Sequence, residues 1–293
     1  MDKVLIFGST GQLGSDLVEV FGNSGSFEVV PLTHEMADCT DADAVRRAVL
    51  HSRPQFVINS AAYVRVDDCE DHTTDAFAVN AIGALNIARA CGEIGACCVY
   101  ISTDYVFDGE KNTPYVESDP TFPINVYGAS KLAGELLVRQ NAPHWLIVRV
   151  SSLFGKTGAR GKGGNFIETV IKKAMAGEIL HVVNDVTISP TYTRDAAEAL
   201  AVIIRDGELG RFHVTNSGGE CTLYEFANAT LECLGLDKIA IPISKNDFPS
   251  RAQRPNRSAL RSERSTKCLR PWRDAMKMYL VEKGYVNESV IRS

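Results

Sequence analysis

A tyrosine and a lysine stand four positions apart in the stretch VYGASKLAGE, which covers residues 126–135. On a helix, this spacing puts Tyr127 and Lys131 on one face, one turn apart. A free phenol has a pKa of about 10 and is a poor acid or base at neutral pH, but a nearby cation lowers that pKa. The pair therefore predicts proton transfer, with Tyr127 as the acid that protonates an alkoxide while a ketone is reduced.

A third polar group for this chemistry comes from the stretch YISTDYVFDG. Residues 97–102 read as a strand whose carboxyl end carries Ser102, Thr103 and Asp104, and ligands of open parallel sheets bind beyond such ends. We expect Thr103 to hold the substrate oxygen. Ser102 is the weaker candidate, because neighbouring side chains on a strand face opposite sides.

A glycine-rich turn precedes these groups by about 115 residues. The stretch GSTGQLG places Gly8, Gly11 and Gly14 three apart, between a predicted strand and a predicted helix. Backbone N–H groups and the helix dipole favour an anion in such a turn, and Gly14 lets the helix pack closely on the sheet. The spacing is typical of short-chain dehydrogenases and predicts a bound dinucleotide.

The coenzyme is expected to be NADPH or NADH, and Lys131 would also reach its nicotinamide ribose. The end of the second strand normally selects between the two, through an acidic or a basic group near the ribose. Here the candidates are Thr33, His34 and Glu35. These residues include both a basic and an acidic group, so the choice between NADPH and NADH stays open.

Strands and helices alternate through the first half of the chain, as crossover connections in a parallel sheet require. Strands are predicted at 3–8, 27–32, 55–62, 97–104 and 144–154, and helices at 12–21, 41–52, 74–95 and 125–140. Asp41 is the predicted cap of the second helix, and Gly95 is expected to end the third. This pattern predicts an α/β fold with helices on both faces of the sheet.

The pattern loosens after about residue 155. A glycine-rich, basic loop covers 156–165, and predicted helices follow near 166–176, 193–205, 222–235 and 272–283, with strands at 179–183 and 211–215. We therefore expect a Rossmann-type doubly wound parallel sheet with a smaller C-terminal substrate-binding lobe. Residues 1–155 would form the dinucleotide-binding domain, with a sheet that later segments complete, and 156–293 mainly the lobe.

Composition excludes several classes of function. The net charge of −5 gives no reason to expect nucleic acid, and no apolar run approaches the roughly 20 residues of a membrane span. The eight cysteines contain no Cys-x-x-Cys pair, so we expect reduced thiols and a cytoplasmic protein. Residues 251–273 hold seven arginines, which predict a solvated or partner-facing surface, with phosphate binding as the alternative.

Several stretches together resemble the dTDP-4-dehydrorhamnose reductases, which are extended short-chain dehydrogenases. They are GSTGQLG, NSAAYVRVDDCE, STDYVFDG, PINVYGASKLAGE, GKGGNFIET and SPTYTRDAAEAL, and the similarity continues to RPWRDAMKMYL near the C-terminus. The resemblance implies that NADPH or NADH reduces the 4-keto group of a nucleotide-linked 6-deoxy sugar. The specific reaction it implies is dTDP-4-dehydro-L-rhamnose to dTDP-L-rhamnose, the last step of dTDP-rhamnose biosynthesis.

The resemblance also implies roles for individual residues. Tyr127 is the acid, Lys131 tunes it, and Thr103 donates a hydrogen bond to the ketone. The implied coenzyme contacts are Gly11, Gln12 and Leu13 at the pyrophosphate, Asp38 and Cys39 at the adenine, and Ala61, Ala62 and Tyr63 after the third strand. Gly8 and Gly14 of the same turn are predicted as further coenzyme contacts, as are Tyr127 and Lys131. The implied neighbours of the sugar nucleotide are Asp104, Ser152 and Asn165.

Some of these positions have a structural alternative. Asp38 would otherwise cap the following turn, and Asn165 the helix that begins at 166. Asp67 and Glu70 are expected to be solvated charges at the start of a helix. The family often has a tryptophan where this chain has Ser152, so a large apolar surface beside the sugar is missing.

Two other functions stay open at this stage. One is a different nucleotide-sugar reductase or a 4-epimerase of the same superfamily. The other is a regulatory subunit, because the β subunit of methionine adenosyltransferase also resembles these reductases. A monomer or homodimer is expected, and no acidic cluster assigns metal ligands.

Overall fold

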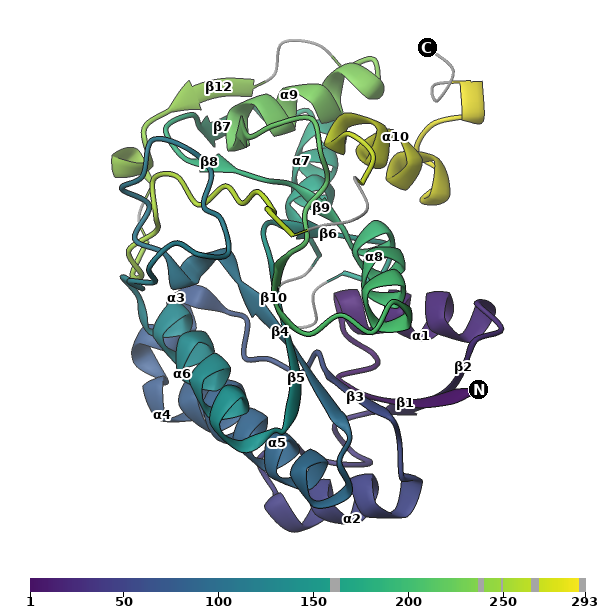
Figure 1. Cartoon of the computed structure of the whole chain (residues 1–293). Helices are drawn as coiled ribbons and strands as arrows, with labels where there is room; N and C mark the ends of the chain where they lie inside the picture. Colours follow the sequence, from purple (N-terminus) through teal and green to yellow (C-terminus); the bar gives the residue numbers. More distant parts are fainter. Residues whose placement is uncertain (159–163, 237–239, 249, 265–268, 290–293) are drawn as a thin grey trace.

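A six-stranded parallel sheet forms the centre of the structure, a computed structural model that describes residues 1–158, 164–236, 240–248, 250–264 and 269–289. Its strand order is β2-β1-β3-β4-β5-β10 (Figure 1). The strands are β1 (Asp2–Phe7), β2 (Phe27–Leu32), β3 (Phe56–Asn59), β4 (Cys97–Thr103), β5 (His144–Val150) and β10 (Gly210–His213). The order reverses at β1, which has β2 on one side and β3 on the other, and ligands bind at such a point in open α/β sheets.

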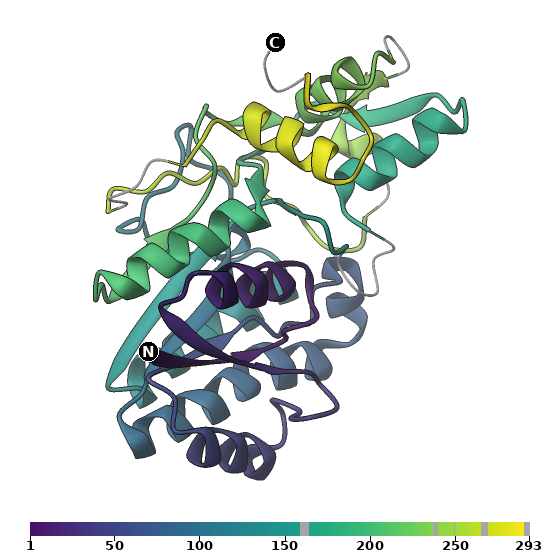
Figure 2. The same ribbon diagram turned by 90° about the vertical axis from the view of Figure 1, so that its right-hand side faces the viewer.

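Helices cover both faces of this sheet, as the alternating pattern predicts. On one face lie α1 (Gln12–Asn23) and α8 (Thr193–Arg205), and on the other α2 (Ala42–Ser52), α5 (Gly83–Ile94) and α6 (Val126–Asn141) (Figures 1 and 2). Each strand contributes alternate side chains to the two apolar cores. In β1, Val4 and Ile6 pack in the core that includes α1 and α8, whereas Leu5 and Phe7 pack in the core that includes α2 and α5.

The helix predicted at 74–95 forms in three segments. It begins as α4 (Thr73–Phe77), continues as one π-helical segment, η1 (Ala78–Ile82), and ends as α5. Gly95 ends it in the left-handed conformation, with φ of 72°. In the π segment the carbonyl of Asn80 accepts a hydrogen bond from the Tyr100 hydroxyl at 2.7 Å, so a side chain on β4 contacts the helix backbone where its winding changes.

The strand predicted at 144–154 ends early, so this prediction is wrong at its end. β5 stops at Val150, and Ser152 has a left-handed backbone with φ of 44°. Residues Leu153–Phe154 then form β6, which pairs with β9 (Thr191–Tyr192) in a separate two-stranded sheet. The left-handed residue redirects the chain out of the main sheet.

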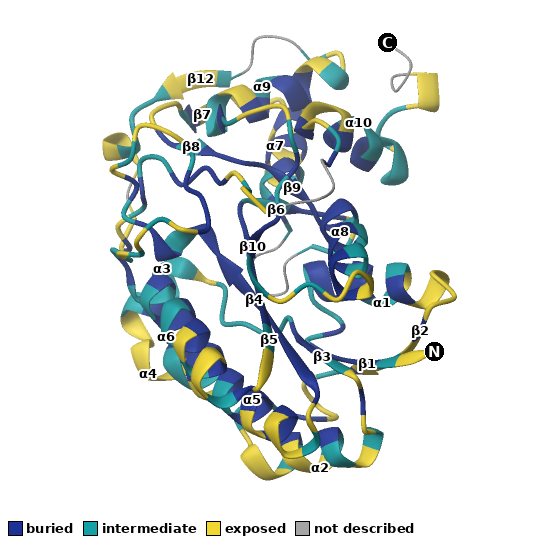
Figure 3. Ribbon diagram, in the orientation of Figure 1, coloured by how far each residue is buried: buried dark blue, intermediate teal, exposed yellow. Residues whose placement is uncertain are grey.

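A smaller group of elements lies beside the carboxyl ends of the strands (Figures 1 and 2). Its helices are α7 (Phe166–Met175), α9 (Leu223–Cys233) and α10 (Trp272–Glu282). Its strand pairs are β7 (Leu180–Val183) with β12 (Ala240–Ile243), and β8 (Thr187–Ile188) with β11 (Cys221–Thr222). Figure 3 shows that the faces these helices turn toward one another are buried. The remaining short helices are α3 (Val66–Asp71), η2 (Asp104–Val106) and η3 (Lys245–Asp247).

The arginines of segment 251–273 are largely paired within the chain. Their carboxylate partners are Asp71 for Arg251, Asp67 for Arg254, Glu220 for Arg257, Glu208 for Arg264 and Asp195 for Arg270. The side chains of these five arginines remain 32–67% exposed, as the expected solvated surface requires, although each also has a carboxylate partner. Their role in the described residues is to join the C-terminal segment to the rest of the fold.

Asp67 stands in the first turn of α3 with its side chain 41% exposed, as expected of a solvated charge, but both Asp67 and Glu70 also have partners within the chain. Asp67 accepts hydrogen bonds from Arg254 at 3.0 Å and from the Ala252 amide at 3.1 Å. Glu70 accepts one from the amide of Val126 at 2.9 Å, at the first residue of α6. Both carboxylates therefore fix segments around the start of the helix that carries Tyr127.

The described cysteines, which leave out Cys268, all carry free thiols. Among the helices in the described ranges, none combines the length and the hydrophobicity that a membrane span needs.

Candidate active site

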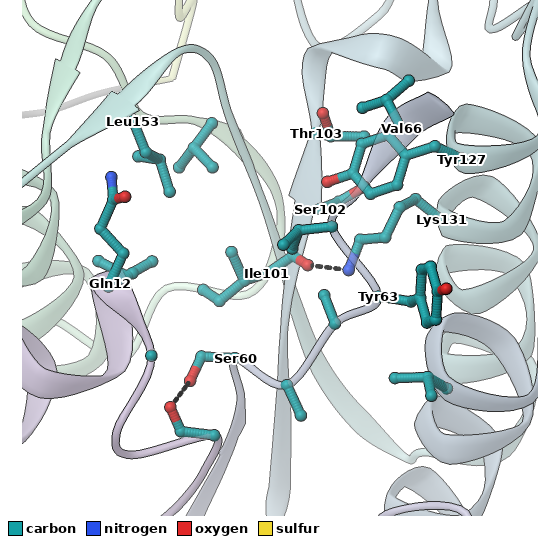
Figure 4. A pocket seen from close by; sticks show the side chains of 18 of the residues that line it. Gln12, Ser60, Tyr63, Val66, Ile101, Ser102, Thr103, Tyr127, Lys131 and Leu153 are labelled. Carbon is teal, nitrogen blue, oxygen red and sulfur yellow. Dashed lines mark hydrogen bonds between the residues drawn. The ribbon is translucent and has the colours of Figure 1, made fainter. Parts of the chain in front are cut away.

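A cavity of about 960 Å³ opens over the carboxyl ends of β1, β3 and β4 (Figure 4). This volume is at the upper end of the range for small-molecule sites, roughly 300–1,000 Å³. The sequence-predicted residues that line it are Gly8, Gly11, Gln12, Leu13, Asp38, Cys39, Ala61, Ala62, Tyr63, Thr103, Asp104, Tyr127, Lys131, Ser152 and Asn165. Gly14 lies behind the turn, so its predicted packing role is the one that applies.

The glycine turn is packed too tightly for side chains. Gly8 has φ of 72°, and a Cβ placed there would lie 2.6 Å from the amide nitrogen of Ala61. A Cβ on Gly14 would lie 2.0 Å from the Gly8 carbonyl oxygen. Gly11 is the N-cap of α1 and leaves the first amides of that helix without a capping side chain. The turn and helix end therefore fit a pyrophosphate, which backbone N–H groups can bind.

Tyr127 lies opposite this turn, near the end of β4 (Figure 4). Its ring packs edge-on against Tyr105 with the ring centroids 5.9 Å apart. Burial raises the pKa of its hydroxyl, and a hydrogen bond with Thr103 acts in the opposite direction. The sequence predicts a lowered pKa for this phenol, whereas burial in the structure raises it.

Lys131 extends from the same face of α6 and is almost fully buried (Figure 4). Its Nζ donates a hydrogen bond to the carbonyl of Ile101 at 2.6 Å and lies 4.1 Å from the centre of the Tyr100 ring. Burial lowers the pKa of Lys131 to about 7, and the nearby charge of Glu135 opposes this shift. The hydrogen bond to β4 therefore fixes the position of the Lys131 ammonium group, and the protonation of that group depends on the buried residues around it.

Thr103 and Ser102 point in different directions, as their alternation predicts. The hydroxyl of Thr103 donates to Asp104 Oδ1 at 3.0 Å, whereas that of Ser102 donates to Glu135 Oε1 at 2.6 Å. Asp104 also accepts from Ser151 at 2.9 Å, and burial raises its pKa to about 6. Thr103 is therefore the hydroxyl on β4 that lies between Tyr127 and Asp104.

Asn165 and Asp38 both have the structural roles that were their alternatives. Asn165 caps α7, because its Oδ1 accepts from the Glu168 amide at 3.0 Å, and its Nδ2 donates to the Tyr279 hydroxyl at 3.1 Å. Asp38 accepts from the Thr40 amide at 2.9 Å within its own turn. Both still line the cavity. Residues 159–163, which include part of the GKGGNFIET stretch, lie outside the described residues.

Asn80 supports the lining of the cavity and was not predicted from the sequence. Fully buried, it binds both backbone groups of Tyr63: its Oδ1 accepts from the amide at 2.8 Å, and its Nδ2 donates to the carbonyl at 3.2 Å. The same Nδ2 donates to Ser130 at 2.9 Å. Asn80 therefore joins the coenzyme-side loop to α6. A lone asparagine on the apolar face of a predicted helix was the available signal.

The similarity of this chain to known proteins shows its family. Residues 2–284 match the family model of the RmlD substrate binding domain. A dTDP-4-dehydrorhamnose reductase of Mycolicibacterium smegmatis is 38% identical over 281 residues, which are 94% of this chain and 84% of the relative. The chain belongs to the RmlD family of dTDP-4-dehydrorhamnose reductases.

Two further members are similar over almost their whole length. The spore coat polysaccharide biosynthesis protein SpsK of Bacillus subtilis is 40% identical over 287 residues, 97% of this chain and 99% of that protein. The crystal structure of dTDP-4-dehydrorhamnose reductase from Bacillus anthracis in complex with NADP superposes with a TM-score of 0.91 at 35% identity. The superposed region covers 96% of this chain and 99% of the Bacillus anthracis chain, so the two share one fold throughout.

Proposed function

We propose that this member of the RmlD family uses NADPH or NADH to reduce the 4-keto group of a nucleotide-linked 6-deoxy sugar. The proposed reaction is dTDP-4-dehydro-L-rhamnose to dTDP-L-rhamnose, catalysed by a monomer or homodimer. The observation that carries the proposal is that Tyr127, Thr103 and the glycine turn face one cavity. Relatives named dTDP-4-dehydrorhamnose reductase support the same reaction.

The coenzyme would lie across the cavity from the glycine turn to α6. Gly11, Gln12 and Leu13 would hold its pyrophosphate at the start of α1, and Lys131 would contact its nicotinamide ribose. Asp38 and Cys39 would meet the adenosine, and 61–63 the middle of the molecule. When bound, the coenzyme supplies a hydride to the carbonyl carbon of the sugar.

Proton transfer is assigned to Tyr127. As the carbonyl carbon gains a hydrogen, its oxygen gains negative charge and takes the proton of the phenol. Burial raises the pKa of Tyr127 and keeps the phenol protonated before the alkoxide forms, so release of the proton requires a positive charge nearby. Thr103 would orient the carbonyl oxygen, and the positive charge of Lys131 would stabilise the phenolate that remains.

The sugar nucleotide is assigned to the side of the cavity that faces the smaller lobe. Asp104, Ser152 and Asn165 line this side, and we propose that residues 156–293 supply most of the substrate contacts. Ser152 leaves space where a larger side chain would contact the sugar. The identity of the sugar and its nucleotide is therefore the part of the proposal that most needs a direct test.

The test compares dTDP-, UDP- and GDP-linked 4-keto-6-deoxy sugars, each with NADPH and with NADH. We expect stoichiometric oxidation of free coenzyme with the dTDP-linked sugar and a 4-hydroxyl product by NMR. Conversion of a sugar nucleotide without net coenzyme oxidation would indicate an epimerase instead. No turnover with any sugar, together with stoichiometric capture of a protein partner, would indicate a regulatory subunit.

A further inference from the structure

Glu135 extends the catalytic face of α6 by one further turn. It follows Lys131 by four residues, as Lys131 follows Tyr127, and is 1% exposed. Its carboxylate is held by Arg149 on β5, which is fully buried: Nε donates to Oε1 at 2.8 Å and Nη2 to Oε2 at 2.7 Å. This bidentate pairing of two buried charges holds the Glu135 carboxylate in one position beneath the active site.

The same carboxylate also binds the strand that holds Lys131. Ser102 donates to Glu135 Oε1 at 2.6 Å, and the preceding residue, Ile101, accepts the hydrogen bond from Lys131 Nζ at 2.6 Å. Figure 4 shows Ile101 and Ser102 beside the lysine at the end of β4. Glu135 is therefore linked to Lys131 twice, through one helical turn and through two successive strand residues.

We propose that Glu135 is a positioning residue for the proton transfer: clamped by Arg149, it fixes the end of β4 and keeps Lys131 positively charged. The catalytic part of this inference rests on the proposed function, because it assigns Lys131 a role beside Tyr127. Arg149 serves by holding the carboxylate in place.

The charges around Lys131 support this role. Tyr127 and Glu135 flank it on α6, the Tyr100 ring packs against it from β4, and the Cys39 thiol faces it from the segment after β2. Burial lowers the pKa of Lys131, and Glu135 is the strongest influence in the opposite direction, ahead of Cys39. Two further charged groups lie beyond these neighbours. Arg149 on β5 is paired to Glu135, and the charge of Asp104 raises the pKa of Tyr127. Without the Glu135 charge, Lys131 would lose its proton at a lower pH.

The direct test measures the pKa of Lys131 by NMR in protein with labelled lysine side chains, without substrate. Lys131→Met assigns the signal. We expect Glu135→Gln to lower this pKa by about one unit, a tenfold change in the ratio of protonated to neutral lysine at a given pH. Glu135→Asp keeps the charge and should leave the pKa close to that of the wild type, although its shorter side chain disturbs the geometry. An unchanged pKa in Glu135→Gln would overturn the inference.

A pH profile of kcat/KM connects the charge to the reaction. The basic limb should move about one unit to lower pH in Glu135→Gln and keep its position in Glu135→Asp. Because Glu135→Gln leaves the buried guanidinium of Arg149 without its partner, the double variant Glu135→Gln/Arg149→Met removes both charges of this pair and is used for the same measurements. Arg211, whose Nε lies 3.9 Å from Glu135 Oε2, is kept in both variants. If the basic limb kept its wild-type position in both Glu135→Gln and the double variant, Glu135 would not keep Lys131 charged during the reaction. If the wild-type protein itself showed no turnover, the proposed function would be wrong, but the NMR measurement would still test the inference.

Discussion

Tyr127 is the residue on which the proposed chemistry depends. Its hydroxyl shares a hydrogen bond with Thr103, and its ring packs against Tyr105, which also lines the cavity. Removing only the hydroxyl keeps the ring packing and the coenzyme site but removes the proton that the alkoxide needs.

We therefore expect Tyr127→Phe to bind NADPH with the affinity of the wild type and to lose about 10²–10⁴-fold in kcat. Tyr105→Phe is the matched control, since it removes a neighbouring phenol from the same cavity and should keep turnover within a fewfold. Coenzyme fluorescence measures the binding and steady-state kinetics the turnover. Turnover in Tyr127→Phe equal to that of the control would remove Tyr127 from the mechanism.

We expect the preference between NADPH and NADH to depend on single residues near the end of β2. Of the three candidates after β2, His34 lines the cavity, and its Nδ1 lies 3.8 Å from Asp38 Oδ1. A 2′-phosphate at this end would meet the negative charge of Asp38. Removing that charge should therefore favour NADPH, whereas NADH carries no phosphate there to repel.

Asp38→Asn should accordingly raise the affinity for NADPH relative to NADH by about fivefold, which corresponds to about 1 kcal/mol between close charges in a water-like medium. Glu35→Gln removes a charge from the neighbouring segment outside the cavity lining and serves as the control. Titration of both coenzymes by fluorescence gives the ratio. If Asp38→Asn and the wild type had the same ratio of NADPH to NADH affinity, the 2′-phosphate would not lie near Asp38.

Spacing predicted which residues would meet, but not how deeply they would be buried. The four-residue interval placed Lys131 on the face of Tyr127, and the structure puts both in one cavity. Burial depends on the packing of β4 and α6, so the raised pKa of Tyr127 and the lowered pKa of Lys131 could not be predicted from the sequence. Glu135 repeats the same interval, and continuing the pattern by one turn would have found it.

At the scale of elements, α1 must approach the glycine turn very closely. A Cβ on Gly14 would overlap the Gly8 carbonyl, whereas a Cβ on Gly22, in the same helix, would meet no atom within 4 Å. Substituting each glycine in turn therefore distinguishes two effects. Gly22 reports the intrinsic cost of glycine in a helix, whereas Gly14 also reports the need for close packing.

Gly14→Ala should destabilise the protein by about 1–3 kcal/mol, as overpacking does, and should weaken NADPH binding because α1 must shift. Gly22→Ala should instead stabilise it by roughly 0.5–1 kcal/mol, because alanine restricts the unfolded chain and favours the helix. Denaturant unfolding measures both changes. If the two variants changed stability in the same direction, close packing of α1 would not be the function of Gly14.

Most elements could be predicted because their apolar periodicity is a local property of the chain. The exceptions arise from contacts made in the folded state. The π segment η1 is contacted by the hydroxyl of Tyr100 from another element, and β5 ends where Ser152 adopts a left-handed backbone. Neither feature has a signature in the residues around it, since serine and asparagine are compatible with many backbone conformations.

For the whole molecule, the two lobes share the central sheet. α8 and β10 come from the second half of the chain, yet α8 packs on α1 and β10 completes the sheet beside β5. The core on that face contains Leu17 and Phe21 of α1 together with Leu200 and Ile203 of α8.

A fragment of residues 1–155 should therefore not unfold cooperatively, because it lacks the helix that covers this core. Circular dichroism during thermal unfolding checks this, with the full chain as the control. A sharp transition in the fragment, near that of the full chain, would show that residues 1–155 form an independent domain.

Long-range charge pairs are the feature of the arginine-rich segment that could not be predicted from the sequence. Arg254 binds Asp67 across 187 positions of the sequence, and Arg251 pairs with Asp71. A run of arginines indicates its charge but not the distant carboxylates that neutralise it. These pairs became visible only once the fold brought α3 next to the C-terminal segment.

In the proposed reaction, the bound coenzyme gives a hydride to the sugar ketone while Tyr127 supplies the proton. The most direct measurement uses NADPH deuterated at the transferred position with dTDP-4-dehydro-L-rhamnose, and NMR of the product. We expect one deuterium at C4 of the sugar for each coenzyme oxidised, and a large loss of this product with Tyr127→Phe. A product without deuterium at C4, or no product with either coenzyme, would contradict the account.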